Sequence, residues 1–172
     1  MRRGLWAVTA MLLLTASLAG CLERRGTLAV ELVVSDGGAI DEFRSINLTF
    51  EKVRIKARTL NPEDQEATTD RVELVEAAAS GRPVPMFAGE VRSDTYQRVT
   101  LIPPTGATFR GYLVDGTQVG VVVEALAIET DFEVPRGGSV TFEFAVRVEK
   151  SLGTGDVPTY RVAAAPEESG TR

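Results

Sequence analysis

The sequence has no histidine and a single cysteine, Cys21. Without histidine, both the commonest general base and the commonest nitrogen ligand for metals are missing. One thiol can form neither an internal disulfide nor a thiolate cluster. No serine lies in a Gly-x-Ser-x-Gly elbow or has a histidine partner. These absences favour a protein that is not an enzyme and has no cofactor, with a stability that comes from packing.

The chain has fewer basic residues than acidic ones, so its net charge is negative. The 172 residues, with 44% hydrophobic and 25% charged side chains, fit one globular domain. Arg2 and Arg3 are the only charges in the first twenty residues, and without them 17 basic and 24 acidic side chains leave a net charge near −7. Such a surface repels nucleic acid and anionic lipid headgroups, which predicts no nucleic-acid partner.

The first 20 residues have the pattern of an export signal. After Arg2 and Arg3, residues 5–18 form an apolar run of about 14 residues, about 21 Å long as a helix and shorter than the ~30 Å of a bilayer core. The next residues, Leu18-Ala19-Gly20-Cys21, resemble the lipobox of prokaryotic lipoproteins. This resemblance implies cleavage between Gly20 and Cys21 and a diacylglyceryl group on the Cys21 thiol.

Two acyl chains would hold the protein on the cell membrane or envelope, facing outside the cytoplasm. Two alternatives remain at this point: an ordinary cleaved signal with a chance cysteine, and an uncleaved N-terminal anchor. The export route also stays open between the general and the twin-arginine pathway. In each case the folded part lies outside the cytoplasm.

After a lipidated tether at residues 21–26, apolar residues alternate with polar ones through a domain at 27–163. Period-two alternation predicts strands at residues 27–35, 43–58, 71–76, 95–102, 108–114, 117–124, 125–134, 139–149 and 159–163. Asp115-Gly116 predicts a two-residue hairpin turn. Residues 61–70 read as a solvated loop, 77–90 carry no clear pattern, and 164–172 read as a flexible tail.

The run at 43–58 changes phase in its middle. Ile46, Leu48 and Phe50 follow one phase, and Val53 and Ile55 follow the other. A β-bulge at Glu51-Lys52 would return the apolar side chains to the core. Two strands joined by a tight kink are the alternative. With almost no helical periodicity elsewhere, the pattern predicts an all-β fold, an antiparallel β-sandwich of about eight strands.

Four segments, in this order, resemble one family. They are Gly26-Thr27-Leu28, residues 43–53 (FRSINLTFEKV), residues 94–99 (DTYQRV) and the last long strand into Lys150-Ser151. Together they are similar to the archaeal and bacterial envelope lipoproteins known as domain of unknown function 4382. The resemblance implies a transthyretin-like or immunoglobulin-like sandwich on the cell surface and brings no catalytic residues.

Three groups of polar residues are candidate sites. Asp36, Asp41 and Glu42 lie near two glycines and are weak candidates for calcium, with a solvated turn as the alternative. The acidic loop at 63–70 has the same two interpretations. Asn47 begins an Asn-Leu-Thr sequon, which chance explains equally well.

The basic stripe at 54–58 alternates Arg54, Lys56 and Arg58 along one predicted strand. It fits either an acidic partner or a solvated strand face. Together these features favour a lipid-anchored, non-enzymatic module for binding, adhesion or scaffolding, with an envelope protein or ligand as partner. The alternative is a small-ligand or calcium-binding receptor component, and a carboxylate-dependent hydrolase is a third hypothesis.

Overall fold

A computed structural model describes residues 25–153 and 157–172. The predicted signal peptide, its cleavage site at Gly20 and Cys21, and most of the predicted tether lie outside the described residues. Within the described part of the chain, no helix has the length and apolar character that crossing a membrane requires.

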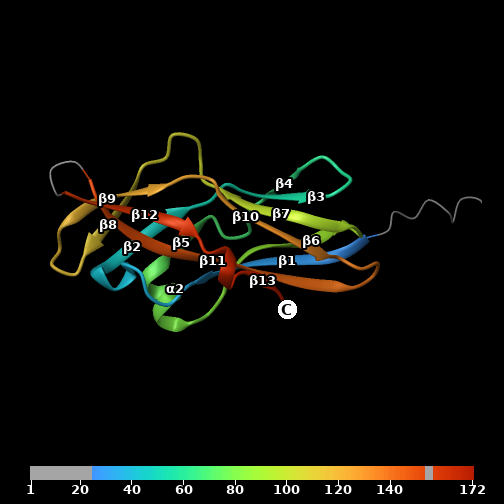
Figure 1. Cartoon of the computed structure of the whole chain (residues 1–172), viewed down its shortest axis with the longest axis horizontal. Coiled ribbons are helices and arrows are strands. Elements are labelled where there is room, and N and C mark those ends of the chain that lie inside the picture. The colour runs from blue at the N-terminus through green and yellow to red at the C-terminus, as the bar shows by residue number, and fades with distance from the viewer. Residues whose placement is uncertain (1–24, 154–156) are drawn as a thin grey trace, which may run out of the picture.

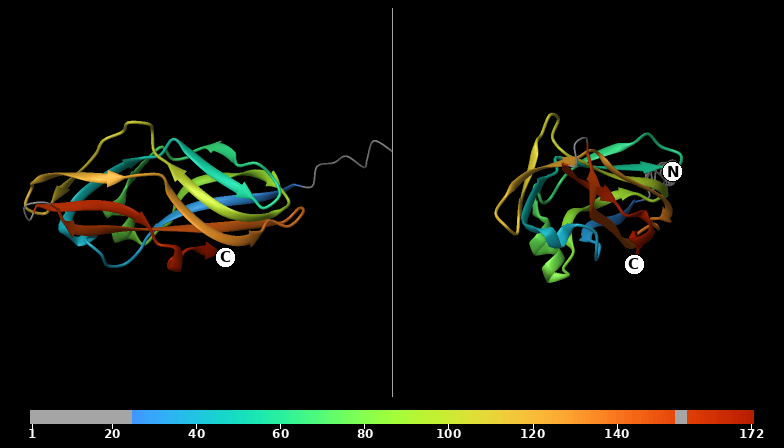
Figure 2. Two further views of the ribbon diagram at one scale, coloured as in Figure 1. Left: turned by 45° about the horizontal axis from the view of Figure 1, so that its top comes forward. Right: turned by 60° about the vertical axis from the view of Figure 1, so that its left-hand side comes forward.

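The structure consists of two β-sheets (Figures 1 and 2). The larger, nine-stranded sheet has the order β5-β2-β8-β9-β12-β11-β1-β6, and β13 also pairs with β11. Its strands are β1 (Arg25–Val34), β2 (Phe43–Thr49), β5 (Arg71–Glu73), β6 (Val84–Arg92), β8 (Phe109–Leu113), β9 (Gln118–Val123), β11 (Ser139–Leu152), β12 (Pro158–Ala164) and β13 (Gly170–Thr171). The smaller sheet has four strands in the order β10 (Leu126–Glu133), β7 (Thr95–Ile102), β3 (Lys52–Ala57) and β4 (Glu63–Glu66).

Strand β11 runs along most of the molecule (Figure 1). Its first half pairs in parallel with β1, and its second half pairs antiparallel with β12. The prediction of a strand here is confirmed, and Phe142, Phe144, Val146 and Val148 are fully buried on one face. The predicted fold is confirmed in that the structure is mostly β and has two sheets. Because β9 and β12 also pair in parallel, the predicted antiparallel pairing holds for most but not all of the strands. The larger sheet is mixed and strongly curved.

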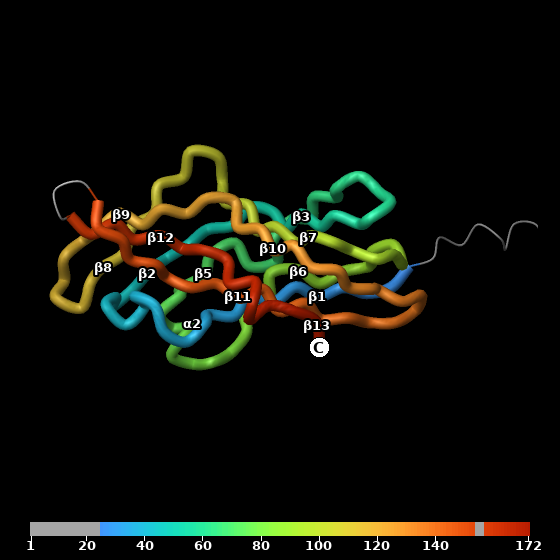
Figure 3. Tube along the Cα trace, viewed as in Figure 1, coloured from blue at the N-terminus to red at the C-terminus, as the bar shows by residue number. Residues whose placement is uncertain are grey.

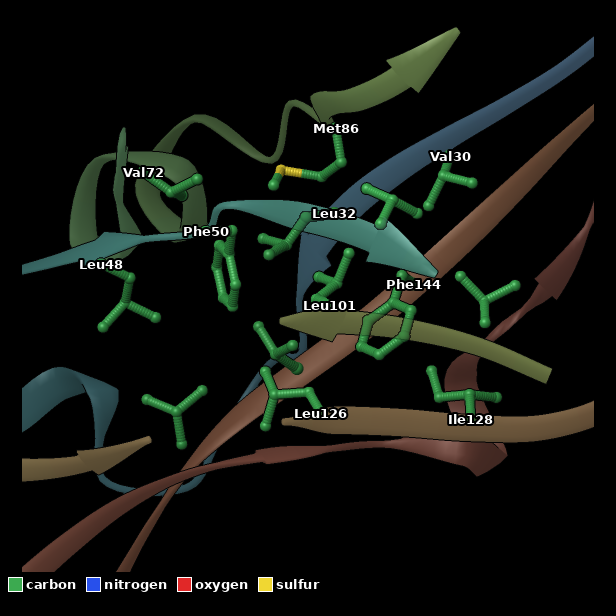
Figure 4. Close-up of a cluster of buried hydrophobic side chains, with 14 of the residues drawn as sticks. Val30, Leu32, Leu48, Phe50, Val72, Met86, Leu101, Leu126, Ile128 and Phe144 are labelled. Carbon is green, nitrogen blue, oxygen red and sulfur yellow. The ribbon is translucent and has the colours of Figure 1, made fainter. Parts of the chain in front are cut away.

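The core lies between the two sheets. Val30 and Leu32 of β1 and Phe144 of β11 approach Leu101 of β7 and Ile128 of β10 (Figure 4). All five side chains are fully buried. Since buried apolar surface contributes roughly 25 cal/mol per Å², this contact holds the smaller sheet against the larger one.

The phase change at residues 50–52 marks a change of sheet. β2 pairs with β5 and β8 in the larger sheet, whereas β3 pairs with β4 and β7 in the smaller one. Phe50 lies at the crossing with no exposed surface, and its N–H donates to Asp70 O at 2.9 Å. The predicted bulge within one strand is therefore wrong, and the alternative of two strands is confirmed. Crossing from one sheet to the other reverses which phase faces the shared core.

Two segments without strand predictions are ordered by pairing. Within the predicted loop at 61–70, β4 pairs with β3 as an edge hairpin. The unassigned stretch at 77–90 contains the end of α2 (Leu74–Ser80) and most of β6. Glu73 caps α2 by accepting from the N–H of Glu76, and Gly81 ends it with φ of 59°.

The hairpin between β8 and β9 is confirmed. The predicted two-residue turn at Asp115-Gly116 is wrong, because the Gly116 N–H donates to Leu113 O and the Leu113 N–H donates to Thr117 O. The loop therefore has three residues, Val114 to Gly116, and Gly116 closes it with a φ of 89°. By contrast, the turn at 135–138 joins β10 to β11 and so connects the two sheets.

The last residues differ from the flexible tail that their polarity predicted. The 3-10 helix η3 (Pro166–Glu168) and β13 lie against β11 instead. Another 3-10 helix, η2 (Ile40–Glu42), precedes β2.

Candidate functional site

The molecule is elongated, and different elements lie at its two ends (Figures 1 and 3). At one end β1 begins, directly after the residues that the structure does not describe. At the opposite end lie the turn between β8 and β9, the end of β11 and the start of β12. A chain attached to a membrane through residues before β1 would therefore present the second end to its surroundings.

The strands that lead to the second end, β8, β9, β11 and β12, and the residues next to them carry the large hydrophobic side chains that are exposed among the described residues. They are Tyr112, Val114, Val122, Leu152 and Val157, and we call these five residues the distal end. Val114, Leu152 and Val157 are exposed by 69%, 71% and 63%, so they contribute almost nothing to the core. Single exposed apolar residues are ordinary, but a concentration at one end is typical of an interaction site.

A groove of about 600 Å³ lies beside the distal end. It is lined by Phe109 and Arg110 of β8, by the whole of β9 and by Pro158 and Thr159 at the start of β12. β12 pairs with β9 only from Tyr160 to Val162. The first residues of β12 are outside this ladder, and the groove lies where the two strands separate.

The exposed face of the β8–β9 hairpin has polar side chains next to Gly120. Arg110 donates to the Gln118 amide oxygen at 3.3 Å, and the Gln118 amide nitrogen donates to the Tyr112 hydroxyl at 2.9 Å. Gly120 lies opposite Arg110, and a Cβ atom added to it would meet nothing within 4 Å. The groove therefore combines apolar walls with hydrogen-bonding side chains, the usual composition of a ligand site.

Glu42 is the centre of a second polar cluster. Its carboxylate accepts from Lys150 Nζ at 2.7 Å and from the Tyr160 hydroxyl at 2.8 Å. The hydrogen bond from Lys150, followed by that from Tyr160, lowers the pKa of Glu42, and the bond to Glu42 raises the pKa of Lys150. Burial, and then the bond to Glu42, raises the pKa of Tyr160. Tyr160 also packs edge-on against Phe43, with ring centroids 4.8 Å apart. The cluster ties η2 to β11 and β12.

The weak calcium candidates do not converge. Glu42 is engaged by Lys150 and Tyr160, while Asp36 and Asp41 contribute no hydrogen bond to it. Across residues 25–153 and 157–172, no three acidic or cysteine side chains form a group that could hold a metal ion.

The predicted basic stripe is largely paired with acidic side chains. Arg54 binds Asp64 of β4 through two hydrogen bonds of 2.5 and 2.9 Å, and Arg58 binds Asp131 of β10 at 2.7 Å. The first of these pairs also uses a residue of the predicted acidic loop. Asp64 on the neighbouring strand β4 and Asp131 on β10, two strands away, thus pair with two of the three basic side chains, which leaves little net charge for an acidic partner.

Asn47 lies on β2 with its side chain partly exposed, and its amide oxygen accepts from Arg71 Nε at 3.1 Å. This hydrogen bond links the Asn47 side chain on β2 to Arg71 on the neighbouring strand β5. Asn47 therefore has a structural role in the sheet, and its glycosylation stays a prediction.

Sequence reasoning did not identify the distal end. One signal was available: Val114 and Val157 are apolar residues next to turn residues, Asp115-Gly116 on one side and Pro158 on the other. Apolar residues in a turn have no sheet face to bury them. Comparisons with protein-family models, with curated proteins and with solved structures found no match to this chain.

Proposed function

We propose that this chain is a lipid-anchored protein of the cell envelope, in which Cys21 carries the lipid and the β domain acts as a non-enzymatic binding module. Partner binding, adhesion or scaffolding takes place through the distal end. The fold in this proposal is a β-sandwich of transthyretin-like or immunoglobulin-like type, related to the envelope lipoproteins of domain of unknown function 4382. The packing of the four-stranded sheet against the larger sheet supports that fold.

One observation carries the proposal. The start of β1 and the turn between β8 and β9 are at opposite ends of the molecule (Figure 1), and the exposed side chains of Tyr112 and Val114 lie next to that turn. An anchor before β1 would hold the first end near the membrane and direct Tyr112, Val114 and Leu152 away from it. Apolar side chains that a protein keeps exposed far from its anchor are available to a partner.

The anchor is tested by cell fractionation of the Cys21→Ser variant. Wild-type protein is expected in the membrane fraction in a lipid-modified form that metabolic labelling with a fatty acid detects. Cys21→Ser is expected to lose the label and to leave that fraction. A variant that stays membrane-bound like the wild type would contradict the lipid anchor.

The binding surface is tested by crosslinking on intact cells. Val114→Asp combined with Leu152→Asp should lower the recovery of crosslinked partners by about tenfold or more, because charges at the centre of an apolar contact are costly. Ala127→Asp, at an exposed position of β10, is the matched control and should leave recovery unchanged. Equal recovery from all three proteins would contradict the proposed surface.

The groove supports a second candidate, a small-ligand receptor. Its volume of about 600 Å³ lies within the range of ~300–1,000 Å³ typical of ligand pockets. Native mass spectrometry of protein purified from its own cells should then detect a bound small molecule, and Arg110→Ala should reduce its occupancy. Protein that is always free of ligand would argue against this candidate.

A further inference from the structure

Residues 169–172 lie as an extended segment along an edge of β11. β12 pairs with β11 from Val146 to Leu152 and ends at Ala164. Beyond that point, Gly170 and Thr171 pair with Glu143 and Phe142 on the next part of β11 (Figure 1). The second half of β11 is thus covered by a full strand, and part of its first half by a very short one.

A few polar contacts complete this arrangement. The Arg172 N–H donates to Thr141 O at 3.1 Å. The Ala145 N–H donates to the Ser169 hydroxyl at 2.9 Å, and that hydroxyl donates to Ala165 O at 2.8 Å. A serine side chain therefore takes the place of a strand carbonyl at Ala145. These contacts provide hydrogen-bond partners for backbone groups of β11 at positions where no regular partner strand is present.

The same edge has an acidic pair that needs a cation. Glu31 of β1 and Glu143 of β11 are direct neighbours in the parallel ladder. Like charges in directly opposite positions repel each other. The Arg172 guanidinium lies between them, 2.6 Å from Glu31 and 2.7 Å from Glu143. The glutamate pair thus selects an extended segment that carries a positive charge.

No buried side chain holds the segment in place. Ala165 is fully buried, but η3 buries no residue, and residues 169–172 are partly or fully exposed. Only hydrogen bonds and exposed ion pairs retain the segment, and water can replace both. The segment can therefore leave β11 without opening the core.

We propose that this edge of β11, from Thr141 to Ala145 with Glu31 and Glu143 beside it, binds an extended strand of a partner protein that carries an arginine or lysine. In this structure the chain's own residues 169–172 occupy the site as an internal substitute. Backbone pairing with the edge supplies affinity, and the two glutamates supply selectivity for the basic side chain. The site lies along the side of the domain, apart from the distal end, and does not depend on the function proposed above.

The test uses the full-length protein in detergent and a fluorescent peptide with the sequence of residues 166–172. In Arg172→Glu, the new glutamate is repelled by Glu31 and Glu143, so the internal segment should leave the edge. If the segment fills the site about 90% of the time in the wild type, its release should strengthen peptide binding about tenfold. Gly170→Pro, which blocks strand pairing without changing the charge, should give the same increase.

Matched controls separate binding at this site from a general effect of the protein's net charge on the peptide, which itself carries two glutamates and one arginine. Arg82→Glu makes the same charge change at an exposed position after α2 and should bind the peptide as weakly as the wild type. Replacing Glu31 and Glu143 by glutamine in the Arg172→Glu protein should abolish the gain, as should a peptide with glutamate in place of its arginine. The proposal is overturned if neither Arg172→Glu nor Gly170→Pro binds the peptide more tightly than Arg82→Glu does.

Discussion

Gly38 lies so close to β11 that a Cβ atom on it would come within 2.5 Å of the carbonyl oxygen of Val148. The same oxygen accepts from the Ala39 N–H at 2.8 Å, and the Ser35 N–H donates to Val146 O at 2.8 Å. The turn after β1 is thereby fastened along β11. Gly38 also has a φ of 70°, so both its conformation and its surroundings require glycine.

Gly38→Ala should therefore lower the free energy of unfolding by about 3 kcal/mol, through left-handed strain and the clash with β11. Gly37→Ala is the matched control. Gly37 has a φ of 90°, but a Cβ atom there meets nothing within 4 Å, so only the strain of about 1 kcal/mol applies. Urea denaturation of both variants measures the difference. Equal losses would show that the contact with Val148 contributes nothing.

The Glu42 cluster predicts a pH-dependent contribution to stability. Hydrogen bonds from Lys150 and Tyr160 lower the pKa of Glu42 in the folded state, so its ionised form favours folding. This contribution is present above the ordinary pKa of a glutamate, 4.5, and is lost as the pH falls through the lowered folded value. Glu42→Gln should lower the Tm at pH 7, and the difference from the wild type should shrink below pH 4.5.

Asp41→Asn is the control for this experiment. Asp41 is next to Glu42 in η2 but makes no hydrogen bond or ion pair within the described part of the chain. Its replacement should leave both the Tm at pH 7 and the acid profile close to those of the wild type. A Tm difference for Glu42→Gln that stays constant down to pH 2 would contradict the proposed role of the carboxylate.

Local alternation predicted most strands because it depends only on which face of each strand is buried. β1, β7, the β8–β9 hairpin, β11 and β12 all lie where the pattern placed them. Alternation does not identify the neighbour of a strand. The parallel partner of Val30, for example, is Phe142, which is more than a hundred residues away. The change of sheet at Phe50 and the mixed pairing were missed for this reason.

The charged motifs of the sequence did not identify a binding site, because their side chains pair with one another in the folded protein. Arg54 and Arg58 looked like a basic stripe until the fold placed Asp64 and Asp131 beside them. The exposure of Val114 and Leu152 depends on where β8 and β11 end in the folded molecule, which no local pattern encodes. Similarly, Arg172 belongs to a polar segment whose order depends on Glu31 and Glu143 in two distant strands.

The crossing at Phe50 predicts a large loss of stability on truncation. The ring is fully buried where the chain passes from one sheet to the other. Phe50→Ala should cost about 3–5 kcal/mol, since it removes apolar contacts and leaves a cavity in the shared core. Leu152→Ala, at a side chain that is 71% exposed, should change the stability by less than about 0.5 kcal/mol. Guanidinium denaturation measures both, and a small effect of Phe50→Ala would contradict its place in the core.

Glu73 joins the start of α2 to β2 through one carboxylate. One oxygen accepts from the Ile46 N–H at 2.8 Å and the other from the Glu76 N–H at 2.5 Å. Glu73→Ala should cost about 2 kcal/mol, because a helix loses its cap and the N–H of a buried residue loses its acceptor. Glu76→Ala removes the same charge one turn later, where it is exposed, and should change stability by less than about 0.5 kcal/mol. Thermal unfolding distinguishes the two, and similar small shifts for both variants would mean that water replaces the Glu73 carboxylate at Ile46.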